Sequence, residues 1–363
     1  MDVCNHHHNN NNRMKPSAKS SMLNNVFYSF FYINIRRCLL FIGLCWLCAM
    51  APMADSAGPS PTSEPTGQPS VVVCQTKTDA GGACCSGDII IDPAITSIAN
   101  NAFESCTSLT SVEMSHVTSV GVTAFLSCSS LTSVIMPLVT SLGNRAFESC
   151  SALITVDMPL LTVVAIKSFK HCPNLINVNM SAVTDVESQG FQYCTNLASL
   201  HFSLITNVGD SAFRGSSLTT LNMPLVTSVG STAFRSCSGL TSVHMPLVTN
   251  VGSAAFRSCS SLTSVHMPLL TNVEASAFRS CNSLTNCNMS LVTSVGNFAF
   301  LSCSSLVSVD MPVVTTLGED SFKSCSSLNS FNVPGQLSLP TSLTSIGNNS
   351  FYQCTGLRGN LFI

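Results

Sequence analysis

A phenylalanine recurs every 22 residues along most of this chain of 363 residues. After one step of 21 residues the series continues to a last, longer step, and its members are Phe103, Phe125, Phe147, Phe169, Phe191, Phe213, Phe234, Phe256, Phe278, Phe300, Phe322 and Phe351. A fixed period of about 20–29 residues is typical of a solenoid, in which each coil buries its apolar side chains against its neighbours. The period therefore predicts a stack of similar coils and makes binding the leading function.

Every coil has the same order of apolar positions, which residues 131–150 (LTSVIMPLVTSLGNRAFESC) illustrate. The leucine, valine and methionine have the L-x-x-L-x-L spacing, in which the last two side chains point to one side of a short strand. Pro137 ends that strand because it has no N–H to donate. Phe147 and Cys150 pack the far side of the coil, and stacked strands are expected to form a parallel sheet.

The pattern A-F-x-x-C-x-x-L-x-x-V-x-M-P-x-V-T-S-V-G closely resembles the BspA-type leucine-rich repeats of surface and secreted proteins, from Ile90 to the C-terminus. The resemblance implies a leucine-rich repeat solenoid, right-handed, with a parallel β-sheet on its concave side. Short turns and 3-10 or helical pieces are expected on the convex side. Strand positions indicate 12–13 coils of 22 residues.

Four segments are expected along the chain. Residues 1–57 are predicted to be a signal peptide or an N-terminal membrane anchor, 58–70 a Pro/Ser/Thr-rich linker, 71–85 an N-terminal cap and 86–363 the solenoid. Basic residues precede the apolar run Cys38–Ala51, as in a secretory signal peptide. The alternative is an uncleaved anchor with the solenoid outside. Both interpretations predict a secreted or cell-surface protein.

Three places depart from the repeat. The coil at Phe213 lacks one residue and its cysteine, and the step of 29 residues between Phe322 and Phe351 adds seven residues, Gly335–Ser342, which are expected to bulge out as a loop. The chain ends at Leu361–Ile363, inside a predicted strand and without a polar cap. Solenoids need capped ends, so two alternatives stay open: this coil self-associates by pairing with another chain, or the sequence is truncated here.

Nineteen cysteines would suit a disulfide scaffold, but twelve of them fall in one column, one per coil. Neighbouring Cβ atoms in such a column lie nearly 5 Å apart, against ~3.5–4.5 Å in a disulfide, so buried thiols are predicted. The column comprises Cys84, Cys106, Cys128, Cys150, Cys172, Cys194, Cys237, Cys259, Cys281, Cys303, Cys325 and Cys354. Cys74 and Cys85 lie off the column, where one disulfide is expected, with each other or with Cys84.

The concave face is the first candidate for ligand binding, since each strand displays polar residues between its inward ones. The candidates are Glu113, Asp157, His201, Asn222, Ser242, His244, Ser264, His266 and Asp310, with His244 and His266 on adjacent strands. Two interpretations stay open: solvated positions kept polar, or a hydrogen-bonding trough for a glycan or a protein loop. Three N-glycosylation sequons begin at Asn179, Asn288 and Asn348, the first two in this trough.

The residue after each phenylalanine is the second candidate, because it is basic in consecutive coils. This row comprises Arg214, Arg235, Arg257 and Arg279, with Lys323 two coils further on. Guanidinium groups bind oxyanions in pairs, so the row suits sulfates or carboxylates on a polymer. The alternative is repetition by duplication, with the arginines splayed into water.

Charged residues make up only 9% of the chain and the net charge is −2, so neither a nucleic-acid footprint nor a polybasic membrane patch is visible. No G-x-S-x-G, H-E-x-x-H or phosphate-cradling glycine loop occurs. We expect no enzyme, no cofactor and no metal site. The prediction is an extracellular recognition or adhesion module for a protein or glycan. The alternatives are a self-assembling cell-wall or matrix component and an acidic-polysaccharide binder.

Overall fold

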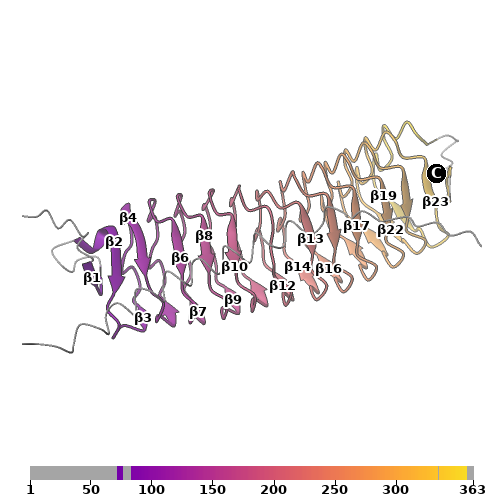
Figure 1. The fold of residues 1–363 in the computed structure, drawn as a ribbon. Helices are drawn as coiled ribbons and strands as arrows, with labels where there is room; N and C mark the ends of the chain where they lie inside the picture. The colour runs from indigo at the N-terminus through magenta and orange to yellow at the C-terminus, as the bar shows by residue number, and fades with distance from the viewer. Residues whose placement is uncertain (1–71, 77–82, 334, 358–363) are drawn as a thin grey trace, which may run out of the picture. The chain divides into compact units, whose positions relative to one another are not determined.

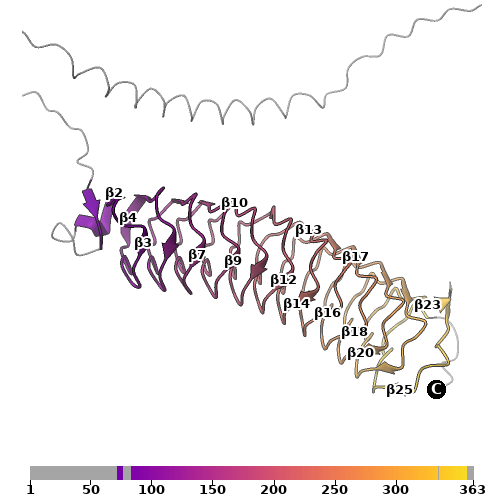
Figure 2. The same ribbon diagram turned by 90° about the horizontal axis from the view of Figure 1, so that it is seen from below.

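The computed structural model describes residues 72–76, 83–333 and 335–357. Over these ranges the chain forms a β-solenoid of about 11 coils of ~22 residues, close to the 12–13 coils expected. Figures 1 and 2 show the coils stacked in chain order from β2 to β25. The predictions for residues 1–57 and 58–70 and for Leu361–Ile363 lie outside the described residues. No helix among the described residues is long and apolar enough to cross a membrane.

The predicted parallel sheet is present, and we call it the main sheet. It follows the L-x-x-V-x-M positions, and its strands are paired in register one coil apart. The strands are β1 (Val72–Cys74), β2 (Ser86–Ile91), β4 (Ser108–Glu113), β6 (Ser133–Ile135), β8 (Thr155–Asp157), β10 (Asn177–Asn179), β13 (Thr220–Asn222), β15 (Ser242–His244), β17 (Ser264–His266), β19 (Asn286–Asn288), β21 (Ser308–Asp310) and β23 (Ser330–Val333).

A second ladder of two-residue strands was not predicted, because two residues are too few for a periodic signal. It forms, in three hydrogen-bonded parts, where the V-T-S-V-G motif crosses the coil, and each strand except the last buries one apolar side chain. We call it the second sheet. Its strands are β3 (Ser97–Ile98), β5 (Ser119–Val120), β7 (Ser141–Leu142), β9 (Val163–Val164), β11 (Asp185–Val186), β12 (Asn207–Val208), β14 (Ser228–Val229), β16 (Asn250–Val251), β18 (Asn272–Val273), β20 (Ser294–Val295), β22 (Thr316–Leu317) and β25 (Ser345–Ile346).

The phenylalanine column forms one continuous stack of buried rings along the solenoid. Neighbouring centroids lie 5.0 to 5.6 Å apart and the ring planes are within 10° of parallel. Offset stacking at these distances is favourable beyond the burial of apolar area. Each ring therefore stabilises two interfaces, one with the preceding coil and one with the next.

The turn side that carries this stack is held by backbone hydrogen bonds to the next coil rather than by strands. Around Phe256, the N–H groups of Ala254, Phe256 and Ser258 donate to carbonyls one coil further on, at 2.8 to 2.9 Å. Ala254 and Ser258 adopt φ values of 55° and 62°. This left-handed conformation is uncommon for residues other than glycine, and it recurs two residues before and after each phenylalanine. In the described coils the turns thus give this side of the solenoid a fixed geometry without helices.

The main sheet is interrupted twice, between β10 and β13 and between β17 and β19. The first break lies in the coil that precedes the shortened one. Phe202 takes the place of methionine there and packs against Phe191 at 6.0 Å, and the described strands skip from β10 to β13. The insertion expected to bulge as a loop instead begins a hairpin. Its strand β24 (Gln336–Leu337) turns back and pairs antiparallel with β23. The N–H of Gly335, at φ 76°, donates to Ser330 Oγ at 2.7 Å in this turn.

Two disulfides, not one, tie the N-terminal cap. Cys74 is bonded to Cys84, one of the pairings left open, whereas Cys85 is bonded to Cys106. Placing Cys84 and Cys106 among the free thiols of the column was therefore wrong. The period correctly puts Cys106 in the column, but it says nothing of the cap, which brings Cys85 within bonding distance.

The other column cysteines are buried thiols, as predicted. Each Sγ donates to the carbonyl oxygen of the phenylalanine in the preceding coil, at 3.0 to 3.2 Å. In the shortened coil Ser216 takes the cysteine's place, and its hydroxyl lies 3.3 Å from the Cys237 thiol. Burial raises the pKa of Cys194 to about 12 and that of Cys237 to about 11.

These thiols are expected to resist alkylation in the folded protein, because only the thiolate reacts and burial suppresses it. Pulsed iodoacetamide labelling at pH 8, read by peptide mass spectrometry, should leave Cys128 to Cys325 unmodified in buffer and fully modified in denaturant. Cys354, 8% exposed and with its pKa raised to about 11, should be modified first. Fast labelling in the middle coils would contradict the buried ladder.

Candidate functional site

The outward face of the main sheet carries the first set of predicted residues. The register aligns Asn222 with His244 and His244 with His266, and further on Asn288 with Asp310. These side chains are exposed, apart from the half-buried Asp310. The sheet therefore displays a polar column over consecutive coils. His201 is exposed as well but lies in the interrupted coil, outside any described strand, so it is not held in the ladder.

His244 and His266 are neighbours in this column and contact each other through their rings. Their rings stack with centroids 4.9 Å apart and planes within 8°. Ser242 and Ser264 face each other in the same two strands, two residues earlier. The four side chains form one polar patch on β15 and β17. Among the described residues, no group of three or more His, Cys, Asp or Glu side chains is placed to hold a metal ion.

Part of this face satisfies its own hydrogen bonds. Asn179 Nδ2 donates to Asp157 Oδ1 at 2.7 Å, and Asn332 Oδ1 accepts from the backbone N–H of Met311. At the N-terminal end the hydroxyls of Thr110 and Ser111 donate to Asp88 Oδ1, both at 2.7 Å. These hydroxyls lower the pKa of Asp88.

Asp88 was not among the predicted residues, since its coil has no phenylalanine to mark it. It lines a hollow of about 270 Å³ together with Glu113. Two carboxylates therefore face this hollow, which lies between β2, β4 and β6.

The basic row lies on the turn side, and its side chains are half-buried. Arg214 packs over the Tyr193 ring, with 5.6 Å from guanidinium carbon to centroid, and Arg279 lies over Phe298 at 6.0 Å. Such contacts orient a guanidinium without neutralising it. Burial, and then the charges of Arg279 and Arg235, lower the pKa of Arg257.

Lys323 differs from the four arginines of the row because it has a carboxylate partner. Lys323 pairs with Asp320 at 2.9 Å, and earlier in the stack Glu148 pairs with Arg145 and Lys170. No carboxylate of a described residue lies within ion-pair distance of the four consecutive arginines. The structure thus brings Arg214, Arg235, Arg257 and Arg279 together as unneutralised cations and sets Lys323 apart.

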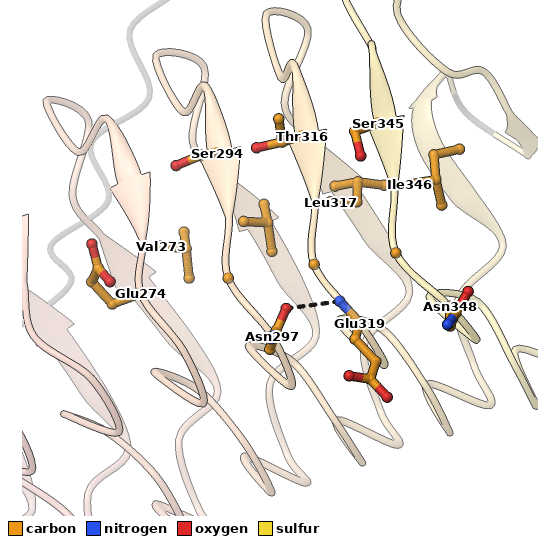
Figure 3. Close-up of a pocket in the computed structure, with 14 residues that line it drawn as sticks. Val273, Glu274, Ser294, Asn297, Thr316, Leu317, Glu319, Ser345, Ile346 and Asn348 are labelled. Atoms are coloured by element: carbon orange, nitrogen blue, oxygen red, sulfur yellow. Dashed lines mark hydrogen bonds between the residues drawn. The ribbon is translucent and has the colours of Figure 1, made fainter.

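A second hollow lies on the second sheet, where the sequence had marked only the sequon at Asn348. It measures about 580 Å³ and lies over β18, β20, β22 and β25, with Glu274, Glu319 and the sequon residue Asn348 among its lining (Figure 3). Gly318 lines it as well, and a Cβ at this position would lie 2.5 Å from the backbone nitrogen of Asn297, so the close approach of the two coils requires glycine. Asn297 Oδ1 accepts from the Glu319 N–H at 2.9 Å, the bond drawn in Figure 3. The hollow is open, and the Asn297 side chain in its lining is already hydrogen-bonded to the backbone. It is therefore a weaker candidate for ligand binding than the polar column or the basic row.

Comparison with known proteins gives a family match and several similar structures. The model described as the BspA type leucine rich repeat region (6 copies) matches residues 82–198, 118–241 and 227–358. A leucine-rich repeat protein from Bacteroides ovatus has a similar crystal structure, with 25% identity, a TM-score of 0.64 and coverage of 79% of this chain and 81% of that one. A leucine rich cell surface protein from Faecalibacterium prausnitzii is 28% identical, with a TM-score of 0.44 and coverage of 69% and 79%. None of the curated proteins matches the chain.

Proposed function

This chain belongs to the BspA-type leucine-rich repeat family, and from that premise we propose that it is an extracellular recognition or adhesion module. It binds a protein or glycan through the outward face of the main sheet and catalyses no reaction. The observation that carries the proposal is the exposed polar column, centred on Ser242, His244, Ser264 and His266. Aligned donors and acceptors at a constant spacing suit a ligand that is itself extended and polar.

The place of action is outside the cytosol. Two disulfides in the cap, Cys74–Cys84 and Cys85–Cys106, favour an oxidising compartment. The sequon residues Asn179, Asn288 and Asn348 are exposed, as N-glycan acceptors must be. A glycan on Asn179 would cover a part of the main sheet away from the histidine pair. Asn288 lies one coil beyond His266 in the same column, so a glycan there would border the patch on that side.

An acidic polysaccharide bound along the four arginines is the second candidate. Four half-buried guanidinium groups in consecutive coils repel one another, and a polymer with regularly spaced sulfates or carboxylates would relieve that repulsion. Burial is the main cause of the lowered pKa of Arg257, and the charges of Arg279 and Arg235 add to it. The row lies on the turn side, so the two candidates need different surfaces and separate variants test them.

The test is binding of the protein, recovered from an exporting host, to immobilised sulfated, carboxylated and neutral glycans and to matrix proteins. For the sheet site we expect binding that changes little between about 50 and 200 mM salt. It should fall at least ~10-fold in His244→Ala/His266→Ala and persist in Arg235→Ser/Arg257→Ser.

The arginine site predicts the opposite pattern. Only acidic polymers should bind, binding should fade steeply with salt, and Arg235→Ser/Arg257→Ser should abolish it while the histidine variant binds normally. No binding across the whole panel would contradict both candidates and favour a structural component of the wall or matrix.

A further inference from the structure

A column of exposed leucines runs along the corner between the main sheet and the second sheet, at the residue after the strand-ending proline. Its nine consecutive positions are Leu138, Leu160, Ala182, Leu204, Leu225, Leu247, Leu269, Leu291 and Val313. Apart from Ala182, each keeps 39 to 47% of its surface exposed. We call this column the leucine ridge. Neither proposed binding surface includes it.

Exposure of the leucine ridge to water is unfavourable, and its surroundings lose few hydrogen bonds when another surface covers them. Contiguous exposed apolar patches of this kind mark interaction sites in soluble proteins. Its neighbours are the strand-ending prolines or serines on one side and a column of threonines on the other. Several of these threonine hydroxyls donate to the threonine carbonyl one coil earlier, as in Thr206 to Thr184 and Thr249 to Thr227. Satisfied hydroxyls lose little when water is removed, and the three columns hold no charged residue over these nine coils.

We propose that the leucine ridge is the contact between two copies of this chain, packed antiparallel about a two-fold axis at Leu225. Its side chains recur once per coil, at the ~4.8 Å spacing of parallel strands. A second copy has the same spacing, so every position of the ridge can lie beside one position of its partner. Because Leu225 is the fifth of nine positions, only an axis there pairs the whole ridge: Leu204 with Leu247, Leu160 with Leu291 and Leu138 with Val313.

The area agrees with a dimer of standard size. Side chains exposed to this extent contribute on the order of 80 Å² each, and with the flanking prolines and threonines the contact approaches ~800 Å² per copy. A two-fold contact uses the same patch on both copies, and it closes, so it yields dimers rather than filaments.

The test is sedimentation velocity of the protein purified from an exporting host, with N-glycans removed, between about 1 and 100 µM. The wild-type chain should move from monomer to dimer over this range. Leu225→Lys/Leu247→Lys places four cations at the axis and should weaken dimerisation at least ~100-fold, leaving monomer throughout. Circular dichroism and the melting temperature should match the wild type, because both side chains lie at exposed turns.

A matched control puts the same charges elsewhere. Ile154 and Ile176 are similarly exposed, at 42% and 49%, but lie just before the N-terminal ends of β8 and β10, whereas the ridge follows the C-terminal ends of the strands. Ile154→Lys/Ile176→Lys should dimerise like the wild type. A monomer at 100 µM for the wild type would overturn the proposal, as would loss of dimer in the control or its persistence in the ridge variant.

Cysteine cross-linking tests the antiparallel arrangement. Leu225→Cys should oxidise to a disulfide-linked dimer, since the axis places the residue beside its own copy. Leu138→Cys should not link to itself but should link to Val313→Cys in a mixture of the two variants. Self-linking of Leu138→Cys would indicate parallel packing and overturn the two-fold arrangement. Binding of a wild-type monomer to phosphatidylcholine vesicles, lost in Leu225→Lys/Leu247→Lys, would assign the ridge to a lipid surface instead and would equally overturn it.

Discussion

Replacing Phe256 with alanine is expected to lower the free energy of unfolding by about 3–5 kcal/mol, the usual range for a buried phenylalanine. The ring is fully buried and stacks on Phe234 at 5.3 Å and on Phe278 at 5.5 Å. Its backbone on both sides is locked in left-handed turns, so the coil cannot collapse to fill the cavity. Since the stability of a repeat protein depends on nearest-neighbour interfaces, one substitution weakens both interfaces of that coil.

The measurement is guanidinium unfolding followed by circular dichroism, with hydrogen exchange to locate the loss. Protection should fall most in the coils of Phe234, Phe256 and Phe278. Phe298→Ala is the matched control. Phe298 is half-buried and outside the stack, and the Arg279 guanidinium lies over its ring. Its loss should therefore cost less than about 1 kcal/mol. Equal destabilisation by the two variants would show that the stack is not the main source of cohesion.

Removing the second cap disulfide by Cys85→Ala/Cys106→Ala is expected to cost about 3 kcal/mol, concentrated at the N-terminal end. The bond joins the cap to the first coil with a phenylalanine, across a separation of 21 residues. It therefore restricts the conformations of the unfolded chain, and in the folded protein it holds the end coil against the coil of Phe103. Without it, β1 and β2 should open locally well before the rest of the solenoid.

Hydrogen exchange and limited proteolysis report this opening. We expect protection in β2 to fall while the coils beyond Phe147 keep theirs. Cys303→Ala is the control, because it removes a free thiol of the same column from the middle of the stack. Its effect should be about 1 kcal/mol and confined to the coils around Phe300. Unchanged protection of β2 in the disulfide variant would mean that strand pairing alone holds the cap.

The period predicted the parts of this protein that repeat. Residues one period apart share a column, so the buried phenylalanines, the parallel main sheet, the thiol ladder and the neighbouring His244 and His266 followed from spacing. The four arginines also followed from spacing as a row. In each case a local rule of apolar alternation and turn residues was copied from coil to coil.

Only the tertiary structure decided what crosses between columns or departs from the repeat. It decided the pairing of Cys85 with Cys106, because the cap folds back outside the period. It showed the second sheet and its hollow, because strands of two residues are too short to give a periodic signal in the sequence. It also showed that Lys323 has a carboxylate partner, whereas the four arginines have none among the described residues, because ion pairs depend on side-chain direction. Finally, it placed the leucine ridge on an exposed corner, since spacing assigns a residue to a column but burial depends on what packs against that column.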